Sequence, residues 1–110
     1  DLPVPDLSYV RLQPMNIAVI RDGRPRYQVL YEIALEVPNV ENKERIAVLM
    51  PRFQDAATRV LYQNPDGGDG AIDPADLDRL KADLQKSADA ILGKGLVSQV
   101  LIVRAMRIDR

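Results

Sequence analysis

The sequence predicts an α+β domain in which helices pack on one face of a three-stranded, mainly antiparallel sheet. Two stretches of alternating apolar residues are separated by a turn signal, which is the pattern of a β-hairpin. Two later stretches carry apolar residues at intervals of three and four, as amphipathic helices do. An apolar run closes the chain, so the expected order of elements is β-β-α-α-β.

The 110 residues are enough for one domain and too few for two. Pro3 and Pro5 restrict the backbone at the start of the chain. Residues 1–8 are therefore expected to form an extended linker ahead of a domain over residues 9–110. The chain begins at Asp1 and not at a methionine, so we expect a fragment or a processed product.

The first strand of the hairpin is expected from Ser8 to Arg21, with an irregularity near its centre. The alternation of apolar residues changes parity at Pro14, which predicts a β-bulge or an open edge there. Asp22 and Gly23 follow the strand and are a favoured pair for a two-residue type I′ turn.

Residues 27–37 show the clearest strand pattern of the chain. Six apolar side chains at every second position share one face: Tyr27, Val29, Tyr31, Ile33, Leu35 and Val37. This face is wide enough to receive helices. Core packing is the default interpretation for Tyr27 and Tyr31, and a partner-binding surface is the alternative.

A helix is predicted over residues 41–63, because apolar residues recur there at spacings of three and four. Asn39 can cap its start. Pro51 either kinks one long helix or opens a second helix at its first turn.

Three arginines of this helix, Arg45, Arg52 and Arg59, repeat every seven residues and fall on nearly one face. Such a row is either solvated or packs against another subunit. Together with Tyr27 and Tyr31, these arginines form the candidate interaction surface of the chain.

The second helix has a clear start, with Asp73 as N-cap and Pro74 at the first helical position, and Gly93 or Gly95 is expected to end it. A final strand is predicted over residues 97–108. Strict alternation places Val97, Leu101, Val103 and Ala105 on one face, and Val100, Ile102, Met106 and Ile108 on the other.

Composition excludes several kinds of chemistry. The chain has no histidine and no cysteine, so it has no thiol nucleophile, no Ser-His-Asp triad and no zinc site built from those ligands. Its 15 basic and 16 acidic residues are mixed, which does not favour nucleic acid as a partner. The acidic glycine-rich loop over residues 64–73 is interpreted as a loop and helix cap, and weak cation binding is the alternative. We expect no cofactor and no enzymatic activity.

Several residues match the pattern of one known family. They are Tyr9, Leu12 and Pro14; Leu35, Glu36 and Val37; Pro51, Arg52 and Asp55; and Leu92, Gly95 and Val97. In this order they resemble the periplasmic domain of the flagellar basal-body-associated FliL family, over residues 9–108. Leu101 and Val103 stand where the family carries an aromatic residue, which indicates a divergent paralogue.

The resemblance implies a stomatin-like fold and a non-enzymatic accessory domain of the flagellar motor. Such a domain lies on the periplasmic side of the bacterial inner membrane and follows a single-pass N-terminal anchor. The implied partners are further copies of the chain, in a homo-oligomer or ring, and the flagellar stator proteins. The alternative is a stomatin-like oligomeric scaffold domain of another bacterial envelope complex. A small-ligand sensor is a third hypothesis, which requires an apolar pocket with convergent polar groups.

Overall fold

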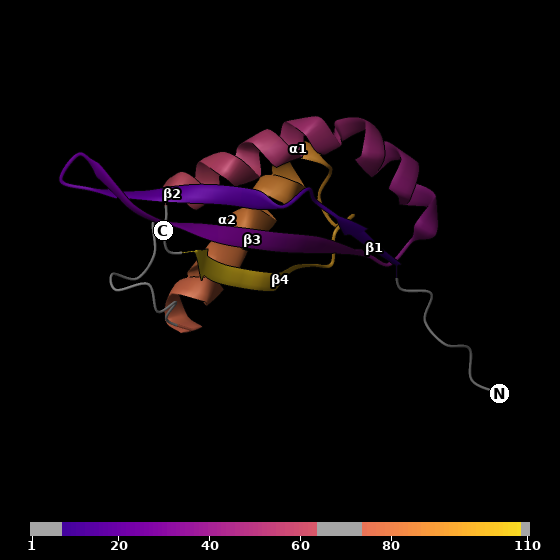
Figure 1. Cartoon of the computed structure of the whole chain (residues 1–110). Helices are drawn as coiled ribbons and strands as arrows, with labels where there is room; N and C mark the ends of the chain where they lie inside the picture. Colours follow the sequence, from indigo (N-terminus) through magenta and orange to yellow (C-terminus); the bar gives the residue numbers. More distant parts are fainter. Residues whose placement is uncertain (1–7, 64–73, 109–110) are drawn as a thin grey trace.

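The computed structural model describes residues 8–63 and 74–108, which form an antiparallel sheet and two helices packed against it (Figure 1). The strands are β1 (Ser8–Arg11), β2 (Met15–Arg21), β3 (Arg24–Val37) and β4 (Gln99–Ile108). The helices are the short 3-10 helix η1 (Val40–Asn42), α1 (Lys43–Gln63) and α2 (Pro74–Ile91). The predicted α+β class and the antiparallel sheet are therefore confirmed.

The sheet has four strands but is only three strands wide, because β1 and β2 lie along the same edge of β3. Leu35 of β3 lies opposite Val10 of β1 on one edge and opposite Val100 of β4 on the other. Beyond the end of β1, β2 pairs with this same edge of β3. The single first strand expected from the sequence is thus two short strands in line. Ser8, the predicted first residue of the strand and also the last residue of the expected linker, is the first residue of β1. Residues 1–7 lie outside the described part of the chain.

The break between β1 and β2 is the predicted bulge. Val10 lies opposite Leu35 and Met15 lies opposite Tyr31, so the first edge uses one residue more than β3 over this stretch. The extra residue changes the side-chain parity. As a result, Leu12 before the break and Met15 after it are both buried in the same core.

The hairpin that joins β2 to β3 has the predicted type I′ geometry. Asp22 and Gly23 have φ angles of 54° and 74°. Positive φ at both central residues is what this turn requires, and it matches the right-handed twist of the flanking strands. The tip therefore sets the pairing of Arg21 with Arg24 and of Ile20 with Pro25, and the extra β3 residue Arg26 shifts the register before Val19 pairs with Tyr27.

The core lies between one face of β3 and the two helices. All six apolar residues that the alternation assigned to this face are buried. The helices contribute their own buried stripes, Ile46, Phe53, Ala57 and Leu61 from α1, and Leu80, Leu84 and Ala88 from α2. Both helices lie on the same side of the sheet (Figure 1). The opposite face of the sheet, named the open face below, has no helix over it among the described elements.

Of the two interpretations of Pro51, a single bent helix is the one observed. α1 is continuous from Lys43 to Gln63 with Pro51 inside it, and Figure 1 shows that its axis bends. Pro51 has no N–H to bond the carbonyl one turn earlier, which explains a bend in this helix. Asn39 caps η1 as expected, since its side-chain oxygen accepts a hydrogen bond of 3.0 Å from the Glu41 N–H.

The expected faces of β4 are partly wrong because this strand also contains a bulge. Arg104 lies opposite Glu32 and Ile102 lies opposite Ile33, so Val103 between them has no partner on β3 and is 48% exposed. Val100, Ile102 and Ala105 therefore share the helix-covered face, and Leu101, Met106 and Ile108 share the open face. Strict alternation had divided the strand differently, because it assumed that no residue is inserted.

We expect the substitution Phe53→Ala to lower the free energy of unfolding by about 3–5 kcal/mol. Phe53 is fully buried and is the largest such side chain in the described core, so its removal leaves a cavity between α1 and the sheet. Arg52→Ala, at the exposed neighbouring position, is the control and should stay within about 0.5 kcal/mol of the parent chain. Urea unfolding measures both. Equal losses for the two variants would contradict the placement of this core.

Candidate interaction surface

Tyr27 and Tyr31 do not belong to an exposed surface. Their side chains are only 7% and 3% exposed and lie in the core beneath the helices. The guanidinium of Arg107 on β4 lies 4.1 Å from the centroid of the Tyr27 ring, which places a cation over the ring. The default interpretation, core packing, is the one observed. The physical reason is the alternation itself, since it puts both tyrosines on the helix-covered face of β3.

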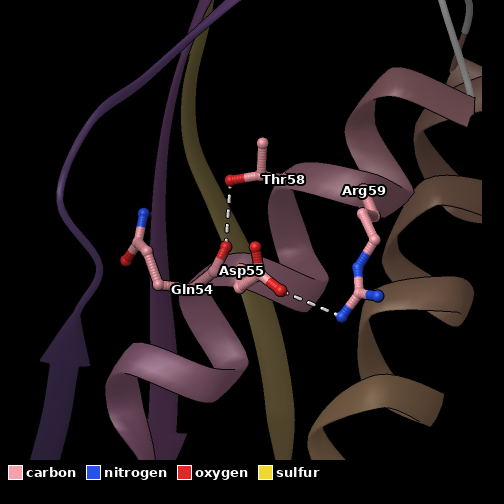
Figure 2. Close-up of polar contacts among 4 residues, drawn as sticks. All are labelled: Gln54, Asp55, Thr58 and Arg59. Atoms are coloured by element: carbon pink, nitrogen blue, oxygen red, sulfur yellow. Dashed lines mark hydrogen bonds and ion pairs between the residues drawn. The ribbon is translucent and has the colours of Figure 1, made fainter.

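The three arginines do lie together on the exposed side of α1. Arg45, Arg52 and Arg59 are all exposed. Arg59 forms an ion pair of 3.0 Å with Asp55, one helical turn earlier (Figure 2). Arg45 and Arg52 form no ion pair with any residue in the described part of the chain.

Two apolar side chains lie among these arginines and were not predicted as surface residues. Val48 is 78% exposed and Tyr62 is 49% exposed. With the arginines and Asp55 they form a line of six residues, spaced alternately three and four positions apart, which we name the outer row: Arg45, Val48, Arg52, Asp55, Arg59 and Tyr62. Spacings of three and four place side chains on one face of a helix. The sequence shows the same spacing, which predicted the arginines of this row but not the residues between them.

A shallow groove of about 550 Å³ lies where α1 passes the break between β1 and β2. Its lining residues are Arg11, Gln13, Ala47, Met50, Pro51 and Gln54. The Gln54 side chain donates a hydrogen bond of 3.1 Å to the Gln13 carbonyl and accepts one of 3.3 Å from the Gln13 N–H. The Gln54 amide thus bonds both the N–H and the carbonyl of Gln13, as the backbone of a neighbouring strand would. The polar groups of Gln13 and Gln54 bind each other, so a ligand would have to displace them.

The middle of α1 has a second local contact that affects its shape. The Thr58 hydroxyl donates a hydrogen bond of 2.9 Å to the Gln54 carbonyl (Figure 2). It also lies 3.5 Å from the sulfur of Met15 on β2. A hydroxyl that bonds the carbonyl four residues earlier favours helix bending. Pro51 and Thr58 therefore act in the same part of α1, beside the break in the first strand.

A polar cluster on the open face is centred on Glu36. Its carboxylate accepts hydrogen bonds from the Ser98 hydroxyl at 2.7 Å, the Gln99 amide at 3.1 Å and the Tyr9 hydroxyl at 3.3 Å. The first two bonds lower the pKa of Glu36 below its ordinary 4.5, and the bond from Tyr9 adds to this effect. Partial desolvation, the Glu36 charge and the same hydrogen bond raise the pKa of Tyr9 above 10.0.

This cluster is suited to joining strands. Tyr9 lies on β1, Glu36 on β3 and Gln99 on β4, so one carboxylate links all three strands of the sheet at this end. Glu32, on the same face of β3 as Glu36, forms a cross-strand ion pair of 3.4 Å with Arg104. Each carboxylate therefore has its own partner, and the two do not share a site for acid-base chemistry.

Within residues 8–63 and 74–108, no group of three or more acidic side chains is arranged so that it could hold a metal ion. None of the helices described there is long and apolar enough to cross a membrane. The loop over residues 64–73, where weak cation binding was the alternative, lies outside the described residues.

The fold and its surfaces define the chain as an α+β domain with an open sheet face and an exposed, arginine-bearing helix face. No protein-family model matches the chain, and a search of the curated proteins finds no match. The function of the domain is therefore a matter of proposal.

We expect the Glu36→Gln variant to lose less stability on acidification than the parent chain. The folded-state pKa of Glu36 is lowered, so its contribution is complete above the unfolded value of 4.5 and is lost as pH falls through the folded pKa. In the variant, the melting temperature should fall less between about pH 6 and about pH 3. Glu44→Gln, at an exposed position of α1, is the control. If the melting temperatures of the parent chain and the Glu36→Gln variant fell equally with pH, the stabilising role assigned to the charged Glu36 would be contradicted.

Gln54→Ala should destabilise the domain by about 1–2 kcal/mol, since it removes both hydrogen bonds to the Gln13 backbone while water replaces them only in part. Amide hydrogen exchange at Gln13 should become faster in the variant. Gln63→Ala, at an exposed position at the end of α1, is the matched control. Unchanged exchange at Gln13 would show that the Gln54 amide does not protect this edge.

Proposed function

We propose that this chain is a non-enzymatic accessory domain of the flagellar motor, which acts by protein–protein contact with copies of itself and with the stator. The observation that carries the proposal is the outer row of α1. It combines exposed arginines with exposed apolar side chains on a helix face that no described element covers. Exposed apolar residues within a polar surface are typical of interaction sites.

The contacts of the acidic residues favour a binding role over a catalytic one. Glu32 is paired with Arg104, and Glu36 accepts three hydrogen bonds that stabilise its charged form. A catalytic acid or base needs a pKa near the working pH, and the pKa of Glu36 is moved in the opposite direction. The groove beside α1 is lined by one arginine and by neutral residues, so its lining contains no carboxylate that could act as a catalytic acid or base.

Self-association is supported by the sheet. Among the described residues, β4 pairs with β3 along one edge only, and its other edge faces away from the sheet. An unpaired strand edge can bind a further strand or another copy of the chain. The bulge at Val103 and the exposed Arg104 limit uncontrolled pairing on this edge, as charges and bulges do in other sheets. The edge and the outer row lie on different elements, so one copy could contact two neighbours.

The resemblance to the FliL family directs the proposal to the motor. The residues that carry it lie at structurally specific positions, such as Pro14 at the strand break, Pro51 at the bend of α1 and Gly95 after α2. By this resemblance the domain would lie in the periplasm behind an N-terminal anchor. A scaffold of another envelope complex would use the same surfaces with a different partner.

The test of this function is rotation under load. The gene is deleted, cells are tethered by a flagellar stub, and torque is recorded after complementation with and without the coding region for residues 9–110. We expect reduced torque or lost stator units, restored only by the intact domain. Immunoblots control for the level of the shortened product. Unchanged rotation in the deletion strain would contradict the motor role and would favour the scaffold of another complex.

A further inference from the structure

The outer row of α1 has the geometry of one side of a helix–helix contact. Its members alternate at three and four positions, which is the spacing of the contact positions in a helix pair. The buried face of α1 is occupied by the core, with Ile46, Phe53 and Ala57 fully buried. The outer row lies on the opposite side of the helix and is left for a second contact.

The apolar members of the row are accessible to a partner. Val48 is among the most exposed apolar residues in the described chain, and Tyr62 presents a ring with a polar tip. In a helix pair such residues pack between the side chains of the facing helix. Their exposure in the single chain is unfavourable, and a partner helix would remove it.

The charge of the row identifies the chemistry of the partner. Three arginines and one aspartate leave an excess of positive charge, and only Arg59 is paired with that aspartate. Arg45 and Arg52 lie seven residues apart, which is about 10 Å along a helix. Carboxylates repeated at the same interval on a facing helix could bond both guanidinium groups at once.

Other occupants fit the row less well. Val48 and Tyr62 are 14 positions apart, about 21 Å along the helix, so the row offers no continuous apolar face for insertion into a lipid surface. The chain as a whole is slightly acidic, with a sequence pI of about 5.4, which does not favour nucleic acid. A protein helix is the occupant that uses both the arginines and the apolar residues.

We propose that the outer row of α1 binds an acidic amphipathic helix of a partner protein. The row is the docking face, Arg45 and Arg52 bond carboxylates of the partner, and Val48 and Tyr62 pack against its apolar positions. This inference rests on the proposed function in one respect, that the domain acts by protein contact, and it names the chemistry of the partner.

The test uses the full 110-residue chain and a synthetic helical peptide of about 20 residues. The peptide carries glutamate at every seventh position, leucine three or four positions away from each glutamate, and alanine and glutamine elsewhere. A second peptide has lysine in place of each glutamate. Fluorescence anisotropy gives the affinities at low and at high salt, and chemical-shift mapping on the labelled chain locates the contact.

Two charge-reversal variants make the test specific. In the first, Arg45→Glu and Arg52→Glu are combined. In the second, Arg24→Glu and Arg26→Glu are combined at the hairpin tip, which changes the net charge by the same amount at exposed positions away from α1. Circular dichroism establishes that both variants keep the fold.

The glutamate peptide should bind the parent chain, with weaker binding at high salt, and should shift the resonances of the outer row. The Arg45/Arg52 variant should lose affinity by roughly tenfold or more, and the Arg24/Arg26 variant should stay within about twofold of the parent. The variant at Arg45 and Arg52 should also prefer the lysine peptide.

Five outcomes would overturn the proposal, and the first four concern the binding of peptides and vesicles. They are absence of binding at millimolar peptide, equal binding of both peptides, shifts confined to the open face of the sheet, and stronger binding of the parent chain to vesicles of phosphatidylglycerol than to the peptide. Self-association in sedimentation experiments that disappears in the Arg45/Arg52 variant would assign the row to a second copy and would equally overturn it. None of these measurements involves a motor, so failure here would leave the torque result unaffected.

Discussion

The rest of the structure depends on the position of β3. Its 14 residues bond β1 and β2 along one edge and β4 along the other, and one of its faces supplies the floor of the core. Ile33, Leu35 and Val37 are almost completely inaccessible to solvent. Because one face of β3 is apolar at every second position, α1 and α2 must both cover that face, and the opposite face is left open.

Two of the three register shifts along β3, those near Pro14 and at Val103, are consequences of the same constraint. A strand that pairs with β3 keeps its apolar residues in the core only if its register matches the pleat. On the first edge, one extra residue near Pro14 lets Leu12 and Met15 both face the helices. On the other edge, the extra residue Val103 brings Ile102 and Ala105 to the helix-covered face. In both places one unpaired residue corrects the phase of a whole strand, and in both it interrupts an edge that would otherwise be regular.

Sequence patterns that span only a few residues predicted the strands and turns better than they predicted the interaction surface. The alternation in β3, the Asp22-Gly23 turn and the parity change at Pro14 are each contained within a few residues, and each prediction is confirmed. The bulge at Val103 has no proline or glycine to mark it and lies in a strand that is apolar on both faces, so alternation alone misplaced half of it. Tyr27 and Tyr31 are buried, as the default interpretation of core packing predicted, and their alternative place in the interaction surface is wrong because the alternation of β3 puts them on its buried face. The hydrogen bonds between Gln54 and Gln13 join positions 41 residues apart and could not be predicted from spacing.

The outer row is held in place by contacts on the other side of α1. Phe53 and Ala57 fix the rotation of the helix against the sheet, and they lie within the same turns as Arg52 and Asp55. Gln54 ties this part of α1 to the backbone at the strand break, beside the bend that Pro51 introduces. A change of the buried face would therefore rotate the exposed one, because a helix has a fixed angle between its residues. The position of the outer row therefore depends on the core. Because the apolar side of α1 packs against β3, the arginines on the opposite side of the helix point away from the sheet.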